Sequence, residues 1–201
     1  MKASTTKPLV AIILILLADQ ILKTWVRTHM YLGQEIKLIG DRVMLHYTEN
    51  NGMAFGLEFG GEAGKYALTL FRIGAVVGIG YGLFFLIKHK YHRGLIMNVA
   101  LIMAGAIGNI IDSTFYGVVY KYAPVFQGRV VDMFYCPILQ GHYPSWFPLW
   151  AGEDFTFFRP VFNVADSAIS IGVIAILIWQ KRYFKEKIEE EPTPNSEVVE
   201  E

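Results

Sequence analysis

Two aspartates stand in apolar surroundings where a carboxylate is unusual. Asp166 lies in "VFNVADS" (161–167), directly before the apolar run "AISIGVIAILIW", and Asp132 lies in "GRVVDMF" (128–134). Two aspartates brought close together cannot easily both ionise, so they share a proton and their titrations are coupled. One carboxylate can then take a proton from water while its protonated partner donates a proton to a peptide carbonyl. If these two residues meet, the pair predicts peptide hydrolysis without a metal or a covalent intermediate.

Each aspartate also has a purely structural interpretation. Asn163 and Asp166 have the spacing of a helix N-cap and its third residue, so Asp166 could be the acid of a capping box, favoured by the helix dipole. Asp132 could be a loop residue that pairs with Arg129 or Arg159. The residues alone leave these alternatives open.

Long apolar blocks determine the class of protein that must position these residues. The chain has 201 residues, is 53% hydrophobic and has a mean hydropathy of +0.35. A bilayer core of about 30 Å is crossed by roughly 20 apolar helical residues, and four segments meet or nearly meet this length: 8–26, 66–88, 94–113 and about 162–180. We expect an all-α membrane protein, a bundle of four transmembrane helices with a small extracytoplasmic β-rich segment and an interfacial loop. Residues 1–188 are expected to form one domain.

The ends of these blocks predict orientation. The first block resembles a signal peptide, but it continues past Ala18 without a convincing cleavage site, so we expect it to remain as a span. Basic residues gather before the first span, between the second and third, and after the fourth, at Lys2, Lys7, 88–93 and 181–187. Such clusters face the cytoplasm, so both termini are predicted to be cytoplasmic. The acidic tail, 189–201, is predicted to be disordered.

Two long outer segments remain. Residues 43–60 alternate roughly like a strand, and Asn51-Gly52 is a hairpin-type turn signal. The aromatic segment 140–158 suits either the bilayer interface or an ordinary folded loop.

Polar residues occur in all four spans and gather toward their outer ends. Height above the cytoplasmic side can be counted at about 1.5 Å per residue from the basic residue at the cytoplasmic end of each span. This count places Asp19 about 18 Å above Lys7, and Lys23 one helical turn further toward the outside. The same count places the others at about 22–28 Å; these are Arg72, Asn109, Asp112 and Asp166. Ionisable groups inside a bilayer normally face a bundle interior and mark function, so a shared polar cavity opening outward is predicted.

Simpler interpretations exist for several of these residues. Asp19 and Lys23 are four residues apart and could neutralise each other, and Arg72 could extend its side chain to the interface. Asp112 is harder to explain, because a carboxylate near the end of a helical span is disfavoured by the dipole.

Several functions are disfavoured. The 18 basic and 18 acidic residues give no electrostatic case for a nucleic-acid partner. The one cysteine, Cys136, excludes an internal disulfide framework and a multi-cysteine metal site. His89 and His92 fit a solvated loop, and phosphate-loop, nucleophile-elbow and HExxH motifs are lacking. We expect no metal and no cofactor.

Five stretches, in order, resemble the motif set of the lipoprotein signal peptidases, also called signal peptidase II. They are "DQILK" (19–23), "ENNGMAFG" (49–56), "GNIIDS" (108–113), "GRVVDMF" (128–134) and "FNVADSAISIG" (162–172). The resemblance implies an aspartic intramembrane endopeptidase of the bacterial cytoplasmic (inner) membrane, with its active site near the outer face. It would remove the signal peptide from diacylglyceryl-modified prolipoproteins, cleaving on the amino side of the lipidated cysteine. Its partners would be these substrates and membrane lipid, and we expect a monomer.

The resemblance also implies roles for individual residues. Asp132 and Asp166 match the catalytic pair, and the polar residues that match the lining of the site are Asn50, Asn109 and Asn163. Asp112 belongs to the third motif, and Asp19 and Lys23 match the first-helix motif, which we interpret as structural support. Gly105 and Gly108 suit close helix approach. Ser113 departs from the family pattern, which usually has an arginine there; Arg129 or Arg159 could substitute for it.

Two rival functions belong to other classes. A proton-coupled transporter or channel subunit could use Asp19, Asp112 and Asp166 as a relay, but transporters commonly show repeats and midplane sites, and a relay should continue inward through spans whose inner halves are apolar here. A non-enzymatic assembly factor with a groove on the outer surface is the other alternative.

Overall fold

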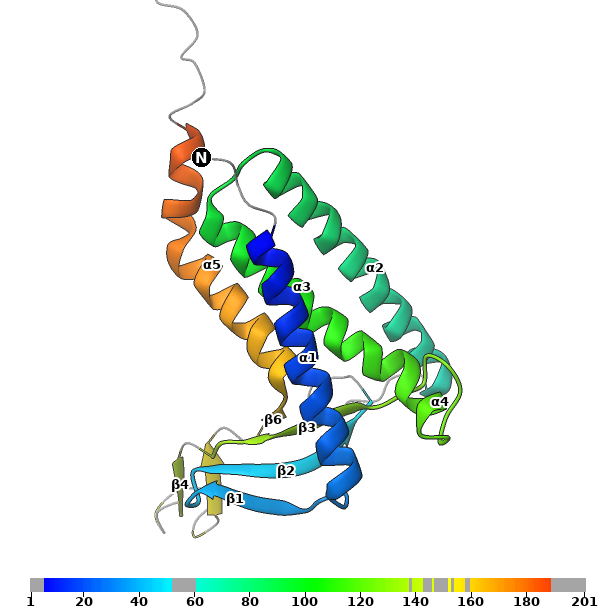
Figure 1. Cartoon of the computed structure of the whole chain (residues 1–201). Coiled ribbons are helices and arrows are strands. Elements are labelled where there is room, and N and C mark those ends of the chain that lie inside the picture. The colour runs from blue at the N-terminus through cyan, green and yellow to red at the C-terminus, as the bar shows by residue number, and fades with distance from the viewer. Residues whose placement is uncertain are drawn as a thin grey trace, which may run out of the picture.

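Four long helices form the body of the protein, and a small antiparallel sheet lies at one end of them (Figure 1). This computed structural model describes residues 6–51, 61–137, 139–142, 146, 152, 154–157 and 160–188. The helices are α1 (Thr6–His29), α2 (Gly61–Lys88), α3 (Arg93–Ile111) and α5 (Val164–Ile188). Each is long and apolar enough to cross a membrane. The prediction of a four-span membrane protein is confirmed.

The third span extends further than the sequence predicts. After Ile111 the chain continues through a π-helical turn, η2 (Asp112–Tyr116), and a short helix, α4 (Gly117–Val119). Asp112 lies at the end of α3, as expected, but the helical path continues beyond it to Val119. Its fully buried side chain has polar partners within the protein. Such π-helical turns occur frequently at functional sites.

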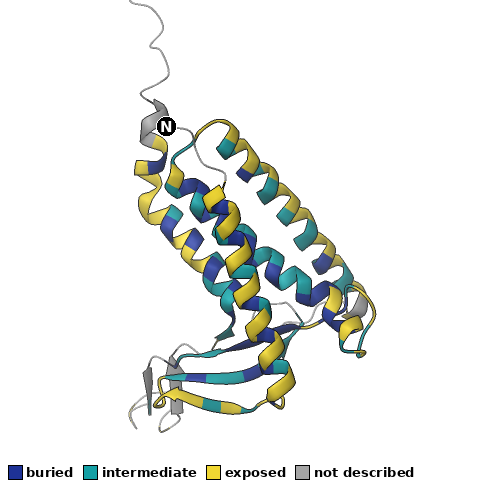
Figure 2. Cartoon of the chain, viewed as in Figure 1, coloured by how far each residue is buried: buried dark blue, intermediate teal, exposed yellow. Residues whose placement is uncertain are grey.

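The outward faces of the helices are apolar and exposed, as lipid contact requires (Figure 2). Between the helices, one buried cluster joins α1, α2 and α3 through Ile12, Leu83, Ile96, Ala100 and Ala104. A second joins the end of α1 to η2 and the sheet through Val26, Met30, Tyr47, Tyr116, Val131 and Met133. The polar residues of α1 and α3 fall between these two clusters along both helices. They therefore form a layer within the bundle.

The main sheet has the strand order β1-β2-β3-β6, with every neighbouring pair antiparallel. Its strands are β1 (Glu35–Ile39), β2 (Val43–Asn50), β3 (Val130–Tyr135) and β6 (Val161–Phe162), while β4 (Leu139–His142) pairs with β5 (Asp154–Phe157). The predicted strand character of residues 43–50 is confirmed. The chain reverses before β2, where Gly40 has a φ of +51°, which glycine adopts readily. The predicted turn at Asn51-Gly52 extends into residues 52–60, which lie outside the described residues.

Asp132 lies on a strand, so its interpretation as a loop residue is wrong. β3 is an inner strand of the sheet, and Asp132 is directly opposite Thr48 of β2. On its other side, Phe134 pairs with Phe162 of β6. Because this pairing is antiparallel, the chain that leaves β6 passes beside Asp132 as it enters α5. Strand pairing thus brings the two aspartate-bearing segments together.

Helix α3 packs against α1, α2 and α5, and small residues permit this close approach. A Cβ atom added to Gly108 would lie 2.7 Å from Asp19 Oδ2 and 3.2 Å from Ala165 Cβ. Both atoms belong to residues on neighbouring helices. The expectation that Gly108 serves helix contact agrees with this geometry.

We expect Gly108→Ala to destabilise the protein by about 1–3 kcal/mol, because the added methyl group must displace Asp19 or Ala165. The matched control is Gly78→Ala on α2, where an added Cβ meets no atom within 4 Å. Unfolding of both purified variants in detergent, followed by circular dichroism, measures the effect. Equal stability of the two variants would contradict the packing argument.

Candidate active site

The start of α5 is closed by a reciprocal capping box. Asn163 precedes the first residue of the helix, and its Oδ1 accepts a hydrogen bond from the backbone N–H of Asp166 at 2.9 Å. In return, Asp166 Oδ2 accepts from the backbone N–H of Asn163 at 3.2 Å. The arrangement satisfies donors that a helix N-terminus leaves unpaired. The capping interpretation of Asp166 is therefore correct, and it does not prevent the other carboxylate oxygen from bonding elsewhere.

Two asparagines connect Asp166 to Asp132. Asn163 Nδ2 donates to Asp132 Oδ1 at 2.7 Å, and Asn109 Nδ2 donates to Asp166 Oδ1 at 2.8 Å. The asparagines also contact each other, since Asn163 Nδ2 lies 3.2 Å from Asn109 Oδ1. Residues from β3, α3 and the start of α5 are thus joined in one hydrogen-bonded group. The structure brings the two carboxylates together around these amides.

Asp132 has the environment of an acid that keeps its proton. Its side chain is only 3% exposed. Burial, followed by the negative charge of Asp166, raises the pKa of Asp132 to about 7. Hydrogen bonds from Asn163 and Asn50 and the charge of Lys23 act in the opposite direction but do not outweigh burial. A buried carboxyl group whose pKa is raised in this way can donate a proton near neutral pH.

Lys23 occupies the centre of the polar layer with no exposed surface. Its Nζ lies 2.9 Å from Asp19 Oδ2 and 2.8 Å from Asp112 Oδ2, and it donates to Asn109 Oδ1 at 3.0 Å. An ammonium group has three donors, so these contacts account for all of them. The predicted pairing of Asp19 with Lys23 is present, and Asp112 joins it as a third member.

The same two aspartates hold the elements that carry the pair. Asp19 Oδ1 accepts from the backbone N–H of Ala165 at 2.9 Å, next to Asp166. Asp112 Oδ2 accepts from the backbone N–H of Val131 at 3.3 Å, next to Asp132. Each half of the candidate pair is therefore attached to the buried cluster through the residue that precedes it in sequence.

Gln20 is a site residue that sequence reasoning missed. Its Nε2 donates to Asp19 Oδ2 at 3.1 Å and to Asp112 Oδ1 at 2.9 Å, while its Oε1 accepts from the Tyr116 hydroxyl at 3.1 Å. Adjacent helical residues point about 100° apart, so periodicity does not group Gln20 with Asp19. The sequence feature that could have indicated Gln20 is its position directly after Asp19, as a second polar residue inside an apolar span.

Arg129 lies away from the pair. Its Nη1 is 3.2 Å from Glu49 Oε2, and Glu49 also pairs with Arg27 and accepts from the Tyr47 hydroxyl at 2.7 Å. Burial opposes ionisation of Glu49, but the Tyr47 hydrogen bond and the two arginines outweigh it and lower the pKa of Glu49. The expected pairing of Arg129 with Asp132 is thus wrong, and Arg159 lies outside the described residues. The arginine that contacts Ser113 is Arg72.

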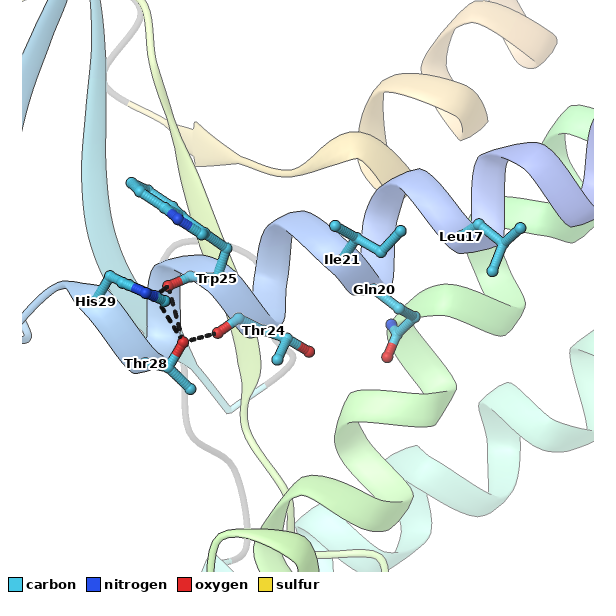
Figure 3. A pocket seen from close by; sticks show the side chains of 7 residues that line it. All are labelled: Leu17, Gln20, Ile21, Thr24, Trp25, Thr28 and His29. Carbon is cyan, nitrogen blue, oxygen red and sulfur yellow. Dashed lines mark hydrogen bonds between the residues drawn. The ribbon is translucent and has the colours of Figure 1, made fainter.

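A second feature of the surface is separate from the pair. An open, largely apolar hollow of about 460 Å³ runs along α1 between Leu17 and His29 (Figure 3). Neither Asp132 nor Asp166 lines it. Among the described residues, His, Cys, Asp and Glu side chains form no group of three that could hold a metal ion.

Comparison with known proteins gives a consistent result. A sequence model of the family described as signal peptidase (SPase) II matches residues 11–182. The lipoprotein signal peptidase of Porphyromonas gingivalis is 46% identical over 187 residues, covering 85% of this chain and 81% of that protein. That of Amoebophilus asiaticus is 41% identical over 179 residues, covering 85% and 75%. A bacterial membrane enzyme solved by the in meso method at 2.3 Å resolution matches with a TM-score of 0.65 and 26% identity, covering 96% of this chain and 98% of that one.

Replacement of Lys23 by methionine should destabilise the protein by about 3 kcal/mol or more, because Asp19 and Asp112 would remain buried without their cation. The control is Lys37→Met, which removes a lysine paired with Asp41 on the exposed surface and should change stability little. Unfolding of both variants in detergent micelles provides the measurement. A Lys23→Met protein as stable as wild type would show that the buried cluster does not hold the bundle together.

Proposed function

Because the chain belongs to the signal peptidase II family, we propose that it is an aspartic endopeptidase acting on diacylglyceryl-modified prolipoproteins. Cleavage occurs on the amino side of the lipidated cysteine and releases the signal peptide. Asp132 and Asp166 are its catalytic pair. One observation carries the proposal: two aspartates from distant parts of the chain share a network of two asparagines at the junction of helices and sheet.

The environments of the two carboxylates support different roles. Asp132 is buried and has its pKa raised to about 7, so it is the member that holds the shared proton and donates it to the scissile carbonyl oxygen. Asp166, which is partly exposed, takes a proton from the attacking water while the water oxygen bonds to the carbonyl carbon. The resulting gem-diol intermediate collapses when that proton passes from Asp166 to the amide nitrogen and the C–N bond breaks, while Asp132 takes a proton back from one of the two hydroxyl groups. A carboxylic acid and an amine are released, and the pair returns to its starting form.

The remaining polar residues position this pair. Asn109 and Asn163 orient the two carboxylates, and Asn50 supplies a further hydrogen bond to Asp132. Asp19, Lys23 and Asp112 hold the backbone beside each catalytic residue. Arg129 acts at a greater distance, because with Arg27 it fixes Glu49, the residue before Asn50 on β2.

The location of the pair suits a substrate anchored in lipid. We place both termini in the cytoplasm of a bacterial cell and the site near the outer face of the inner membrane, since basic residues cluster at the opposite helix ends. Residues 1–188 act as one monomeric peptidase domain. A precursor held by its diacylglyceryl group would then present its peptide bond at the depth where the helices meet the sheet.

Asp132→Asn and Asp166→Asn should each abolish cleavage of a diacylglyceryl-modified precursor by the purified protein, because one variant lacks the acid and the other lacks the base. Asparagine retains the shape and much of the hydrogen bonding, so both variants should unfold near the wild-type temperature. The matched control is Asp41→Asn, which changes an exposed carboxylate in the turn between β1 and β2; this variant should cleave normally. Near-normal cleavage by either pair variant would refute the assignment.

The kcat of the wild-type protein should fall as pH rises through about 7, because Asp132 then loses the proton that it donates. Histidines also change charge in this pH range, so His46→Gln, on β2, is the control and should keep the same alkaline limb. Initial cleavage rates at saturating precursor between pH 5 and 9 test this. A rate that stays constant up to pH 9 would contradict the role of Asp132 as the acid.

A further inference from the structure

Arg72 of α2 bonds to the helix that carries the site. Its Nη1 donates to Ser113 Oγ at 3.3 Å. The Ser113 hydroxyl in turn donates to the backbone carbonyl of Asn109 at 2.9 Å, so its oxygen is oriented to accept from the guanidinium. Asn109 is the residue whose side chain donates to Asp166. Two hydrogen bonds thus link Arg72 to Asn109, the residue whose side chain bonds Asp166.

The charge of Arg72 acts on both members of the pair. The guanidinium interacts electrostatically with both carboxylates, more strongly with Asp166 than with Asp132. Its side chain is only partly exposed, and a half-buried guanidinium interacts with nearby carboxylates more strongly than one in water. The expectation that Arg72 merely extends toward the interface therefore does not describe its contacts.

Lys23 does not serve the same purpose, although its charge also reaches Asp132. Its three donors are taken by Asp19, Asp112 and Asn109, and two carboxylates already share its single positive charge. Among the residues that the structure describes, the charged groups around the pair are Lys23 and Asp19 from α1, Asp112 from η2 and Arg72 from α2. Within this set, Arg72 is the cation that is not paired with the Asp19–Asp112 cluster.

We propose that Arg72, anchored by Ser113, is a positioning residue of the peptidase site whose fixed positive charge keeps the Asp132–Asp166 pair in its singly protonated, singly charged form. The inference rests on the proposed function and adds a contribution from the second span to it. A pair with two protons lacks the base, and a pair with none lacks the acid. The positive charge favours loss of the first proton at neutral pH, so that one carboxylate is ready to accept from water.

Arg72→Gln tests the charge, and Arg72→Lys preserves it. Without the cation, both protons of the doubly protonated pair are bound more tightly, so both limbs of the pH–rate profile of Arg72→Gln should move to higher pH by roughly one unit. Below the wild-type optimum its kcat should fall about tenfold. Arg72→Lys should keep the wild-type profile and most of the kcat. Ser113→Ala retains the charge of Arg72 but removes the hydroxyl that anchors it. This variant should lower kcat and shift the pH–rate profile less than Arg72→Gln does.

Lys65→Gln is the matched control, because it removes one positive charge from the same helix at a residue that bonds Asn51. It should leave the profile in place. Thermal unfolding of each variant separates a folding defect from a change in rate, and the Arg72→Lys variant keeps the test decisive if Arg72→Gln folds poorly. An unshifted profile in Arg72→Gln, or equal losses in Arg72→Gln and Arg72→Lys, would overturn the proposal.

Cleavage assays on the wild-type protein, the two aspartate variants and Arg72→Gln together separate the failure of this inference from the failure of the proposed function. If the wild-type protein does not cleave the lipidated precursor, or if Asp132→Asn cleaves it, the peptidase assignment fails. If the wild-type protein cleaves, both aspartate variants are inactive and Arg72→Gln retains the wild-type pH profile, only the role of Arg72 fails.

Discussion

A fully buried lysine is the constraint on which the rest of the structure depends. In a bilayer, an ion without partners is costly, and Lys23 has no exposed surface. Its charge is compensated only when α1 supplies Asp19 and the third span supplies Asp112 and Asn109. Those carboxylates also bind backbone N–H groups at the start of α5 and on β3. One ion therefore specifies how four elements dock, which is a better-attested use of buried charge than added stability.

The cluster of Lys23, Asp19 and Asp112 also holds the Asp132–Asp166 pair in place. Asn109 accepts a hydrogen bond from Lys23 through its oxygen and donates one to Asp166 through its nitrogen, so the same side chain belongs to the supporting cluster and to the pair. Strand β3 brings Asp132 to the same place through its antiparallel pairing with β6, which leads directly into α5. Positioning groups fixed in this way need little rearrangement when a substrate binds.

Local patterns predicted the parts of the site that local physics determines. Hydropathy located the four spans, the rise per residue placed the polar groups at a common depth, and the spacing of Asn163 and Asp166 predicted their capping box. Long-range contacts were not predictable in this way. The strand that carries Asp132 is defined by partners on β2, 80 or more residues earlier in the chain, and on β6. Gln20 and the contact between Arg72 and Ser113 likewise depend on how helices pack, which a single sequence does not reveal.

The two carboxylates differ before any substrate arrives, and this difference follows from the architecture. Asp132 extends from an inner strand into a nearly closed environment, so burial favours its neutral form. Asp166 begins a helix, where a negative charge is favoured by the dipole, and each of its oxygens accepts a hydrogen bond. An ionised carboxylate can only accept hydrogen bonds, whereas a protonated one must also donate. Under the proposed mechanism, the junction of a strand with a helix N-terminus thus assigns the roles of acid and base to two chemically identical side chains.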